Sequence, residues 1–141
     1  MNIRNLMILL VSCVLATSAF AAEKKKPPSP LTVDGAVTVD AAQAKAHYDK
    51  GVVFLDVRSD KDWAAGRIKG AKHLELKKKY NEDSLSKLVK KDEGVVIYCN
   101  GSPCPRSSQA SAKAVGWGYT KVYYFRDGVP AWKTAGFPTE K

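Results

Sequence analysis

Two cysteines, Cys99 and Cys104, lie in a Gly/Pro-rich stretch between a run of apolar residues and a segment rich in Ala and Ser. The apolar run, Val95 to Tyr98, predicts a strand, and the small residues from Ser107 onward predict a helix. Cys99 would therefore stand at the end of the strand, close to backbone N–H groups and the positive end of a helix dipole. Such surroundings favour a thiolate, so the spacing indicates a reactive cysteine rather than an inert buried thiol.

The elements that must position this loop alternate between strands and helices. Residues 37–39 predict a short strand, and the apolar runs at residues 52–55, 95–98 and 122–125 predict strands of the kind that is buried in a parallel sheet. Helical patterns predict a helix capped by Asp40 that runs to about Asp49, one from Leu85 to near Gly94, one that begins at Ser107 or Ser108, and a short one opened by residues 130–132. This order indicates an α/β domain with a mainly parallel central sheet flanked by helices. Ligands of such sheets bind beyond the carboxyl ends of the strands, where Cys99 falls.

The N-terminal residues predict export. Arg4 precedes an apolar run from Leu6 to Ala19, and Ala19-Phe20-Ala21 supplies a cleavage site of the small-x-small type. These features are typical of a secretory signal peptide over residues 1–21, and the run is too short for a membrane span. A competing lipoprotein-type cleavage box, Leu10-Val11-Ser12-Cys13, comes early, and the apolar residues continue past it. We therefore expect a periplasmic protein without stable membrane insertion after cleavage.

Cleavage after Ala21 would leave 120 residues, enough for one domain, and two of the three cysteines. An oxidising compartment permits a disulfide between Cys99 and Cys104. Two cysteines are too few for a disulfide scaffold, so an apolar core has to hold the domain together. Residues 22–34 contain three lysines and three prolines, and we expect them to form a flexible linker before a domain at residues 35–138.

The chain is basic, with a formal net charge of +9, or +8 once Arg4 is removed with the leader. Aromatic residues do not alternate with the lysine clusters and the sequence has no nucleic-acid-binding motif, so nucleic acid is not an expected partner. A solvated surface explains most of the charge, and attraction for small anionic substrates is the alternative. Metal ligation is not expected, because Cys-x4-Cys with the scattered His47 and His73 is poor ligand spacing. The oligomeric state is left open.

Several short motifs occur together in the order and spacing of one known family. They are Leu55-Asp56-Val57-Arg58, Asp62-Trp63, Gly66-Arg67-Ile68-Lys69-Gly70-Ala71, Tyr98-Cys99, Gly118-Tyr119, Val122-Tyr123 and the segment from Gly128 to Trp132. Over about residues 35–138 the chain resembles the rhodanese-like domain family. The resemblance implies a rhodanese-like fold, a sulfur-carrying cysteine at the base of the active-site loop, here Cys99, and no metal or organic cofactor.

The active-site loop departs from the family pattern. A typical rhodanese loop has Arg five and Ser six positions after the cysteine, whereas Arg106 and Ser107 follow Cys99 by seven and eight. The longer loop contains Cys104, and its Cys-Asn-Gly-x-x-Cys-x-x-Ser pattern is similar to that of a subgroup of exported bacterial rhodanese-like proteins. Arg67 stands where the family often has a histidine. These departures leave the fold expectation intact and leave the sulfur donor and acceptor open.

The resemblance implies a persulfide cycle. A Cys99 thiolate would attack the outer sulfur of a small anionic donor such as thiosulfate, sulfite would leave, and a thiol or cyanide would accept the sulfur. Loop N–H groups are expected to hold donor oxygens, and Arg106 is expected to add a charge-assisted bond. Ser107 is expected to cap the helix in preference to taking part in the chemistry. The candidate substrate-binding residues are thus Asn100, Gly101, Ser102, Arg106 and Ser107.

Cys104 has three possible roles. It resolves a Cys99 persulfide or sulfenate as a disulfide, it is itself the primary nucleophile because it lies nearer the helix start, or it forms a static structural disulfide. The static disulfide is disfavoured because a loop this short restricts the unfolded chain little. A turn at Asn100-Gly101 would bring the two Cα atoms within about 7 Å, which a disulfide can span.

A sulfurtransferase is the leading functional interpretation. The alternative is an exported thiol–disulfide redox protein that uses Cys99 and Cys104. A non-catalytic binding module is disfavoured because the cysteine at the strand end is present. A cysteine phosphatase or arsenate reductase would need an arginine six positions after Cys99, where Pro105 stands instead.

Overall fold

The computed structural model describes residues 28–141, so the expected signal peptide and the start of the expected linker lie outside the described residues. A parallel sheet is formed, in spatial order, by β1 (Val37–Thr38), β6 (Val122–Phe125), β5 (Val95–Tyr98), β2 (Val53–Asp56) and β4 (Lys72–His73). Two further strands, β3 (Arg67–Ile68) and β7 (Thr139–Glu140), pair antiparallel. The expected α/β class with a mainly parallel sheet is confirmed.

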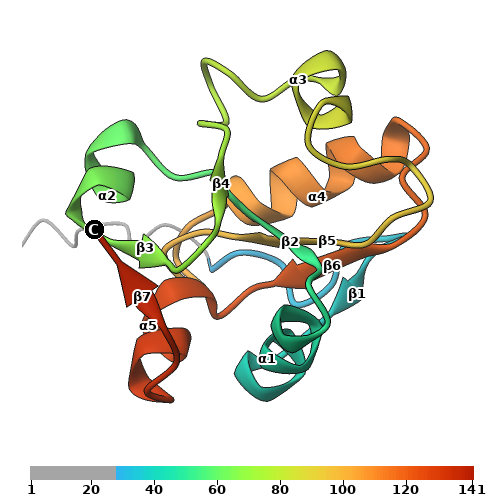
Figure 1. Ribbon diagram of the computed structural model, residues 1–141. Helices are drawn as coiled ribbons and strands as arrows, with labels where there is room; N and C mark the ends of the chain where they lie inside the picture. The colour runs from blue at the N-terminus through green and yellow to red at the C-terminus, as the bar shows by residue number, and fades with distance from the viewer. Residues whose placement is uncertain (1–27) are drawn as a thin grey trace, which may run out of the picture.

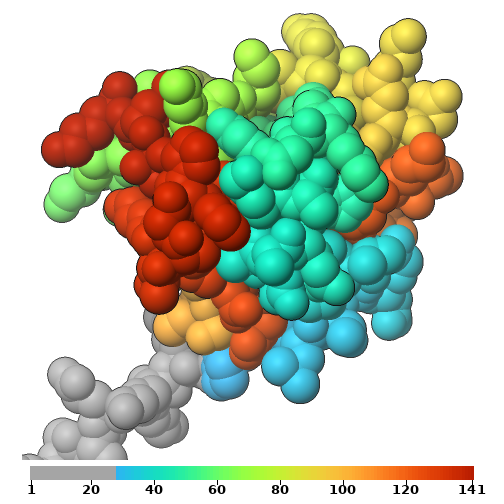
Figure 2. All heavy atoms as spheres, turned by 60° about the horizontal axis from the view of Figure 1, so that its bottom comes forward, coloured from blue at the N-terminus to red at the C-terminus, as the bar shows by residue number. Residues whose placement is uncertain are grey.

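Helices cover both faces of this sheet (Figure 1). One face carries α3 (Glu82–Ser86) and α4 (Arg106–Gly116), and the other carries α1 (Ala41–Asp49) and α5 (Gly128–Thr134). The remaining helix, α2 (Asp60–Ala65), lies beside β3. Figure 2 looks onto the face formed by α1 and α5, which contact each other. Of the helices in residues 28–141, none is long and apolar enough to cross a membrane.

Side-chain alternation along β5 divides its residues between two apolar cores. Val95 and Ile97 pack with α4, whereas Val96 and Tyr98 pack with residues of α1 and α5, and all four are fully buried. Successive side chains in a strand point to opposite faces, and this period continues past the end of β5. It places the Cys99 side chain in the core on the α4 side of the sheet.

The predicted strands at 95–98 and 122–125 and the helix capped by Asp40 are confirmed. The helix expected from Leu85 to near Gly94 is wrong, because α3 ends at Ser86. A turn follows, in which Glu93 N donates to Lys90 O and Lys90 N donates to Glu93 Oε2. This local bonding of side chain to backbone competes with further helical turns. The strand expected at 37–39 is present as β1, with both of its residues exposed, whereas β3, β4, β7 and α2 are too short to show a recognisable period in the sequence.

The described part of the expected linker contacts the domain. Ser29 is buried, and its N and Oγ both donate to Ser102 O at 2.7 Å. Arg126 donates to Ser29 O from Nε at 3.1 Å and from Nη2 at 3.0 Å, and the Tyr124 hydroxyl donates to Pro30 O at 2.9 Å. The segment from Pro28 to Leu31, called the arm below, is therefore held against the carboxyl edge of the sheet.

Candidate active site

Cys99 directly follows β5 at the carboxyl edge of the sheet, and its exposed fraction is 0%. Its carbonyl accepts a hydrogen bond of 3.1 Å from Val129 N in the first turn of α5. Gly128 precedes Val129 with φ +58°, and a Cβ atom at Gly128 would lie 2.2 Å from Cys99 O. Glycine is therefore required for α5 to begin this close to the cysteine. The backbone of Cys99 is held between β5 and α5.

Cys104 lies in the loop that connects β5 to α4. Its Cα atom is 6.4 Å from that of Cys99, and the two Sγ atoms are placed at bonding distance. The chain bends at Asn100-Gly101, where Gly101 has φ +104°, and the hydrogen-bonded turn lies one step later, over residues 102–103, where Cys104 N donates to Gly101 O at 3.0 Å. Cys104 is partly exposed, whereas Cys99 is buried, so a reagent from solvent meets Cys104 first.

The loop and the start of α4 offer backbone donors. Neither Gly101 N nor Ser102 N has an acceptor within residues 28–141. The helix begins at Arg106, and in the described part of the chain no side chain caps it. First-turn N–H groups have no intrahelical partner, and the N-terminal end of a helix favours negative charge. The arrangement can therefore hold an anion or a developing negative charge beside the cysteines.

The expected cap at the start of α4 is wrong. Pro105 occupies the cap position, and Ser107 is the second residue of the helix. The Ser107 hydroxyl is buried and has no hydrogen-bond partner among the described residues. The Ser108 hydroxyl donates to Pro105 O at 2.8 Å, which directs it to a carbonyl group and not to an unpaired N–H group.

Arg106 is paired within the protein. Its Nη1 donates to Glu75 Oε1 and, at 3.5 Å, to Val57 O. Burial acts to raise the pKa of Glu75, but the hydrogen bond and positive charge of Arg106 outweigh it, so this pKa lies below its usual value. The guanidinium expected to contact the sulfur donor is thus already balanced by a buried carboxylate.

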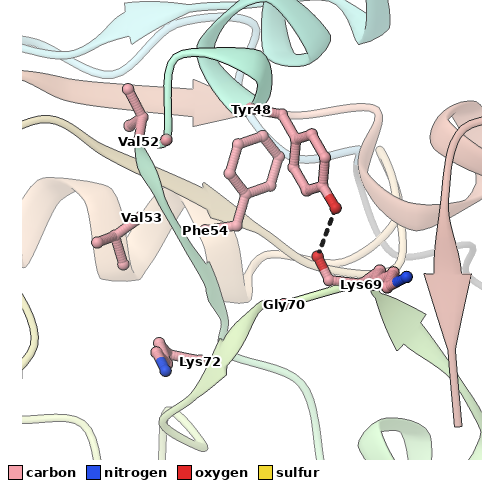
Figure 3. A pocket seen from close by; sticks show the side chains of 8 residues that line it. Tyr48, Val52, Val53, Phe54, Lys69, Gly70 and Lys72 are labelled. Atoms are coloured by element: carbon pink, nitrogen blue, oxygen red, sulfur yellow. Dashed lines mark hydrogen bonds between the residues drawn. The ribbon is translucent and has the colours of Figure 1, made fainter.

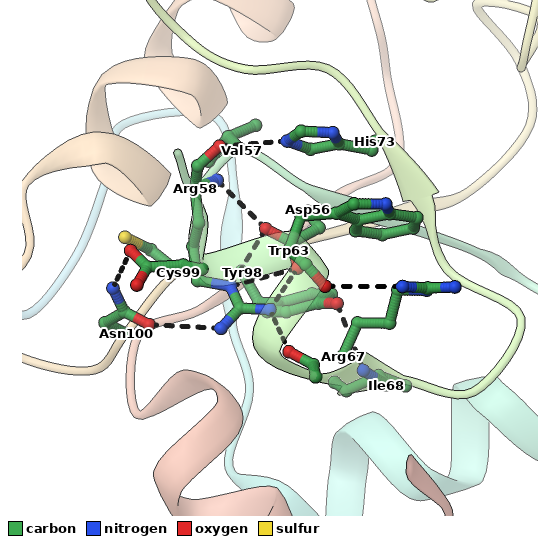
Figure 4. A network of polar contacts seen from close by, with 12 residues as sticks. Asp56, Val57, Arg58, Trp63, Arg67, Ile68, His73, Tyr98, Cys99 and Asn100 are labelled. Carbon is green, nitrogen blue, oxygen red and sulfur yellow. Dashed lines mark hydrogen bonds and ion pairs between the residues drawn. The ribbon is translucent and has the colours of Figure 1, made fainter. Parts of the chain in front are cut away.

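A polar network holds the residue after Cys99 (Figure 4). Arg58 Nη2 pairs with the buried Asp56 Oδ2 at 2.7 Å, and Arg58 Nη1 donates to Asn100 Oδ1 at 3.3 Å. Asn100 Nδ2 in turn donates to Asp62 Oδ2 at 3.0 Å, and this bond lowers the pKa of Asp62. The Asn100 side chain therefore anchors the loop to α2 and to the end of β2.

All the candidate residues from the sequence lie in one loop and the first turn of α4: Cys99, Asn100, Gly101, Ser102, Cys104, Arg106 and Ser107. Sequence reasoning missed four residues that hold this loop: Ser29, Asp62, Glu75 and Val129. Asp62 and Val129 lie within motifs that carry the family resemblance, and Glu75 is an acidic residue between Leu74 and Leu76, so of the four only Ser29 gave no signal in the sequence.

A cavity of about 320 Å³ lies elsewhere, near the amino end of β2 (Figure 3). It is lined by Tyr48, Gly51, Val52, Val53, Phe54, Lys69, Gly70 and Lys72, and the Tyr48 hydroxyl donates to Lys69 O at 3.0 Å. None of the candidate loop residues lines it, so it is separate from the cysteine site. Over residues 28–141, the His, Cys, Asp and Glu side chains form no group of three that could hold a metal ion.

The pattern that defines the family described as "Rhodanese-like domain" matches residues 40–135. The chain belongs to the rhodanese-like domain family. It is 32% identical over 134 residues to "Protein HIGH ARSENIC CONTENT 1, mitochondrial" of Arabidopsis thaliana, covering 89% of this chain and 76% of that protein. It is 31% identical over 98 residues to "Thiosulfate sulfurtransferase GlpE" of Pseudomonas fluorescens (strain SBW25), and this match covers 69% of this chain and 84% of that protein. The solved rhodanese-like domain of the Alr3790 protein from Anabaena sp. has a TM-score of 0.63 at 28% identity, covering 73% of this chain and 77% of that one.

Proposed function

We propose that the protein is a sulfurtransferase that carries sulfur as a persulfide on Cys99 and moves it from a thiosulfate-like donor to a thiol or cyanide acceptor. The position of Cys99 carries this proposal: it ends a parallel strand, faces α4, and is followed by a loop whose Gly101 and Ser102 N–H groups lack acceptors in residues 28–141. A relative that bears the name thiosulfate sulfurtransferase supports the same class of donor.

The proposed cycle starts from the dithiol form of the loop. The Cys99 thiolate attacks the outer sulfur of thiosulfate, the S–S bond of the donor breaks, and sulfite leaves with the bonding electrons. The negative outer sulfur of the persulfide is stabilised by the loop N–H groups and the start of α4. An acceptor thiolate or cyanide then attacks this outer sulfur, and the Cys99 thiolate returns.

The test is thiocyanate formation from thiosulfate and cyanide by the reduced full chain. Cys99→Ser is expected to fall to the background rate, because it has lost the sulfur carrier. Cys104→Ser is expected to keep turning over, and with thiosulfate alone it should gain one sulfur atom in its intact mass. Normal turnover in Cys99→Ser with loss in Cys104→Ser would assign the nucleophile to Cys104.

A thiol–disulfide redox protein is the second candidate, favoured by the 6.4 Å separation of the Cys99 and Cys104 Cα atoms. This distance is within the range of natural disulfides, and we propose that the pair is oxidised when the protein is isolated from an oxidising compartment. Rapid exchange of the pair with a dithiol, together with no sulfite release from thiosulfate, would favour this candidate over the sulfurtransferase.

We also propose that the protein is exported to the periplasm, on the evidence of Arg4, the apolar run and the Ala19-Phe20-Ala21 site. N-terminal sequencing of the protein from the periplasmic fraction should begin at Ala22. Recovery of a membrane-bound form with a lipid on Cys13 would contradict this assignment.

A further inference from the structure

A sulfur atom carried on Cys99 would have a second nucleophile beside it. Cys104 Sγ is placed at bonding distance from Cys99 Sγ, the atom that becomes the inner sulfur of a persulfide. The turn at Gly101 and the hydrogen bond from Cys104 N to Gly101 O bring Cys104 back over the strand end. The loop therefore directs Cys104 to the inner sulfur.

Resting on the proposed function, we propose that Cys104 resolves the Cys99 persulfide within the chain, so that the protein reduces a sulfane-sulfur donor to sulfide with the electrons of its own dithiol. The Cys104 thiolate attacks Cys99 Sγ, the Cys99–Cys104 bond forms, and the bond to the outer sulfur breaks. The outer sulfur leaves as hydrosulfide. In total, one thiosulfate and two thiols give one sulfite, one hydrogen sulfide and one disulfide, and the two thiol protons leave with the sulfide.

Burial favours this internal route over transfer to an outside thiol. Cys99 has an exposed fraction of 0% with Cys104 placed against it, so an external acceptor has to approach a Cys99 persulfide past Cys104. Cys104 needs no encounter from solution, and a nucleophile held close to its target has a large advantage over a dissolved one. The N–H groups of Gly101 and Ser102, which have no acceptor in the described residues, can stabilise the charge that develops on the departing sulfur.

The same difference in exposure identifies the chemical class of the partner. A second turnover requires reduction of the Cys99–Cys104 disulfide, and Cys104 is the partly exposed member of the pair. One thiolate of a dithiol reductant attacks Cys104 Sγ, and Cys99 leaves as a thiolate beside the start of α4. The second thiol of the reductant then releases Cys104. The partner is therefore a dithiol reductant, and the enzyme consumes one dithiol for each sulfide it releases.

The test is a single turnover without external thiol. The full chain with Cys13→Ser, so that two thiols remain, is reduced, freed of reductant and mixed with thiosulfate. Sulfite, sulfide and the intact mass of the chain are measured over time. We expect one sulfite and one sulfide per chain, a final mass lower by two hydrogen atoms, and a rate constant for sulfide release that does not depend on the chain concentration.

The matched variants separate the two steps. Cys104→Ser and Cys104→Ala, in the same background, should release one sulfite, retain one added sulfur and lower the sulfide yield at least tenfold. Gln109→Ala, an exposed change one turn into α4, should behave as the parent. Absence of sulfite from the parent chain would refute the sulfurtransferase itself. Sulfite release with a stable persulfide on the parent, or full sulfide yield from both Cys104 variants, would overturn the internal resolution alone.

Discussion

Replacing Gly128 by alanine should destabilise the protein through the backbone of its proposed catalytic cysteine. Gly128 has φ +58°, in the left-handed region, and an added Cβ atom would lie 2.2 Å from Cys99 O and 2.9 Å from Gly101 N. Both neighbours are backbone atoms, which cannot rotate away as a side chain can. Either α5 or the end of β5 has to shift, and this shift would disturb the hydrogen bond from Val129 N to Cys99 O that joins them.

The magnitude has two parts. The left-handed conformation costs a residue with a Cβ atom about 1–2 kcal/mol. Forcing an extra carbon into a packed site typically costs a further ~1–3 kcal/mol in displaced neighbours. The free energy of unfolding of Gly128→Ala should therefore fall by roughly 2–5 kcal/mol, which is a large part of the stability of a domain of this size.

Gly136→Ala is the matched control, because Gly136 has φ +75° but an added Cβ atom there would meet no other atom within 4 Å. It should lose only the cost of the left-handed conformation, about 1–2 kcal/mol. Urea unfolding measures both variants, and sulfite release from thiosulfate measures the site. Gly128→Ala should also slow sulfite release, since Cys99 and Gly101 move with the clash. Equal losses of stability in the two variants, with unchanged sulfite release, would refute the proposed role of Gly128.

Three further predictions concern the polar contacts around the loop. Asp56→Asn should lower the free energy of unfolding, measured by urea unfolding, by about 3–5 kcal/mol, because it leaves the buried Arg58 charge unpaired. A loss below ~1 kcal/mol would contradict this. Ser29→Ala should lower the free energy of unfolding by about 1 kcal/mol, because one of the two hydrogen bonds from Ser29 to Ser102 O is removed. An unchanged urea midpoint would show that this bond does not hold the arm. The pKa of Glu75 is lowered from its ordinary value of 4.5, so its stabilising effect is present above that pH and is lost as the pH falls through the native pKa. Urea midpoints at a series of acid pH values should therefore fall more steeply for the parent than for Glu75→Gln, and parallel curves would exclude this contribution.

The place of Cys99 could be predicted because it depends on local patterns. A continuous apolar run from Val95 to Tyr98 is typical of a buried parallel strand, and a strand of known extent fixes where its carboxyl end lies. The change of direction at Asn100-Gly101 is equally local, since Gly101 supplies the positive φ, although the hydrogen-bonded turn itself lies at residues 102–103. Both features require only residues that are adjacent in the chain.

The contacts that hold the loop could not be predicted in the same way. Ser29 and Ser102 are 73 positions apart, and Glu75 and Arg106 are 31 apart. No periodic pattern links residues that meet only because two loops end at the same edge of a sheet. The helix start was misplaced for a related reason: Ser107 is a favoured cap residue, but its buried position in the fold keeps its hydroxyl away from the unpaired N–H groups.

These long-range contacts determine which cysteine can move. Asn100 is bound to Arg58 and Asp62, and Ser102 is bound to the arm, so the part of the loop next to Cys99 is fixed to the body of the domain. Cys104, by contrast, has its backbone hydrogen bond with Gly101 of the same loop. We therefore expect Cys104 to move more readily than Cys99 once the bond between them is broken. The sulfur carrier then keeps its place at the strand end through both proposed steps, and the second thiol moves to meet it.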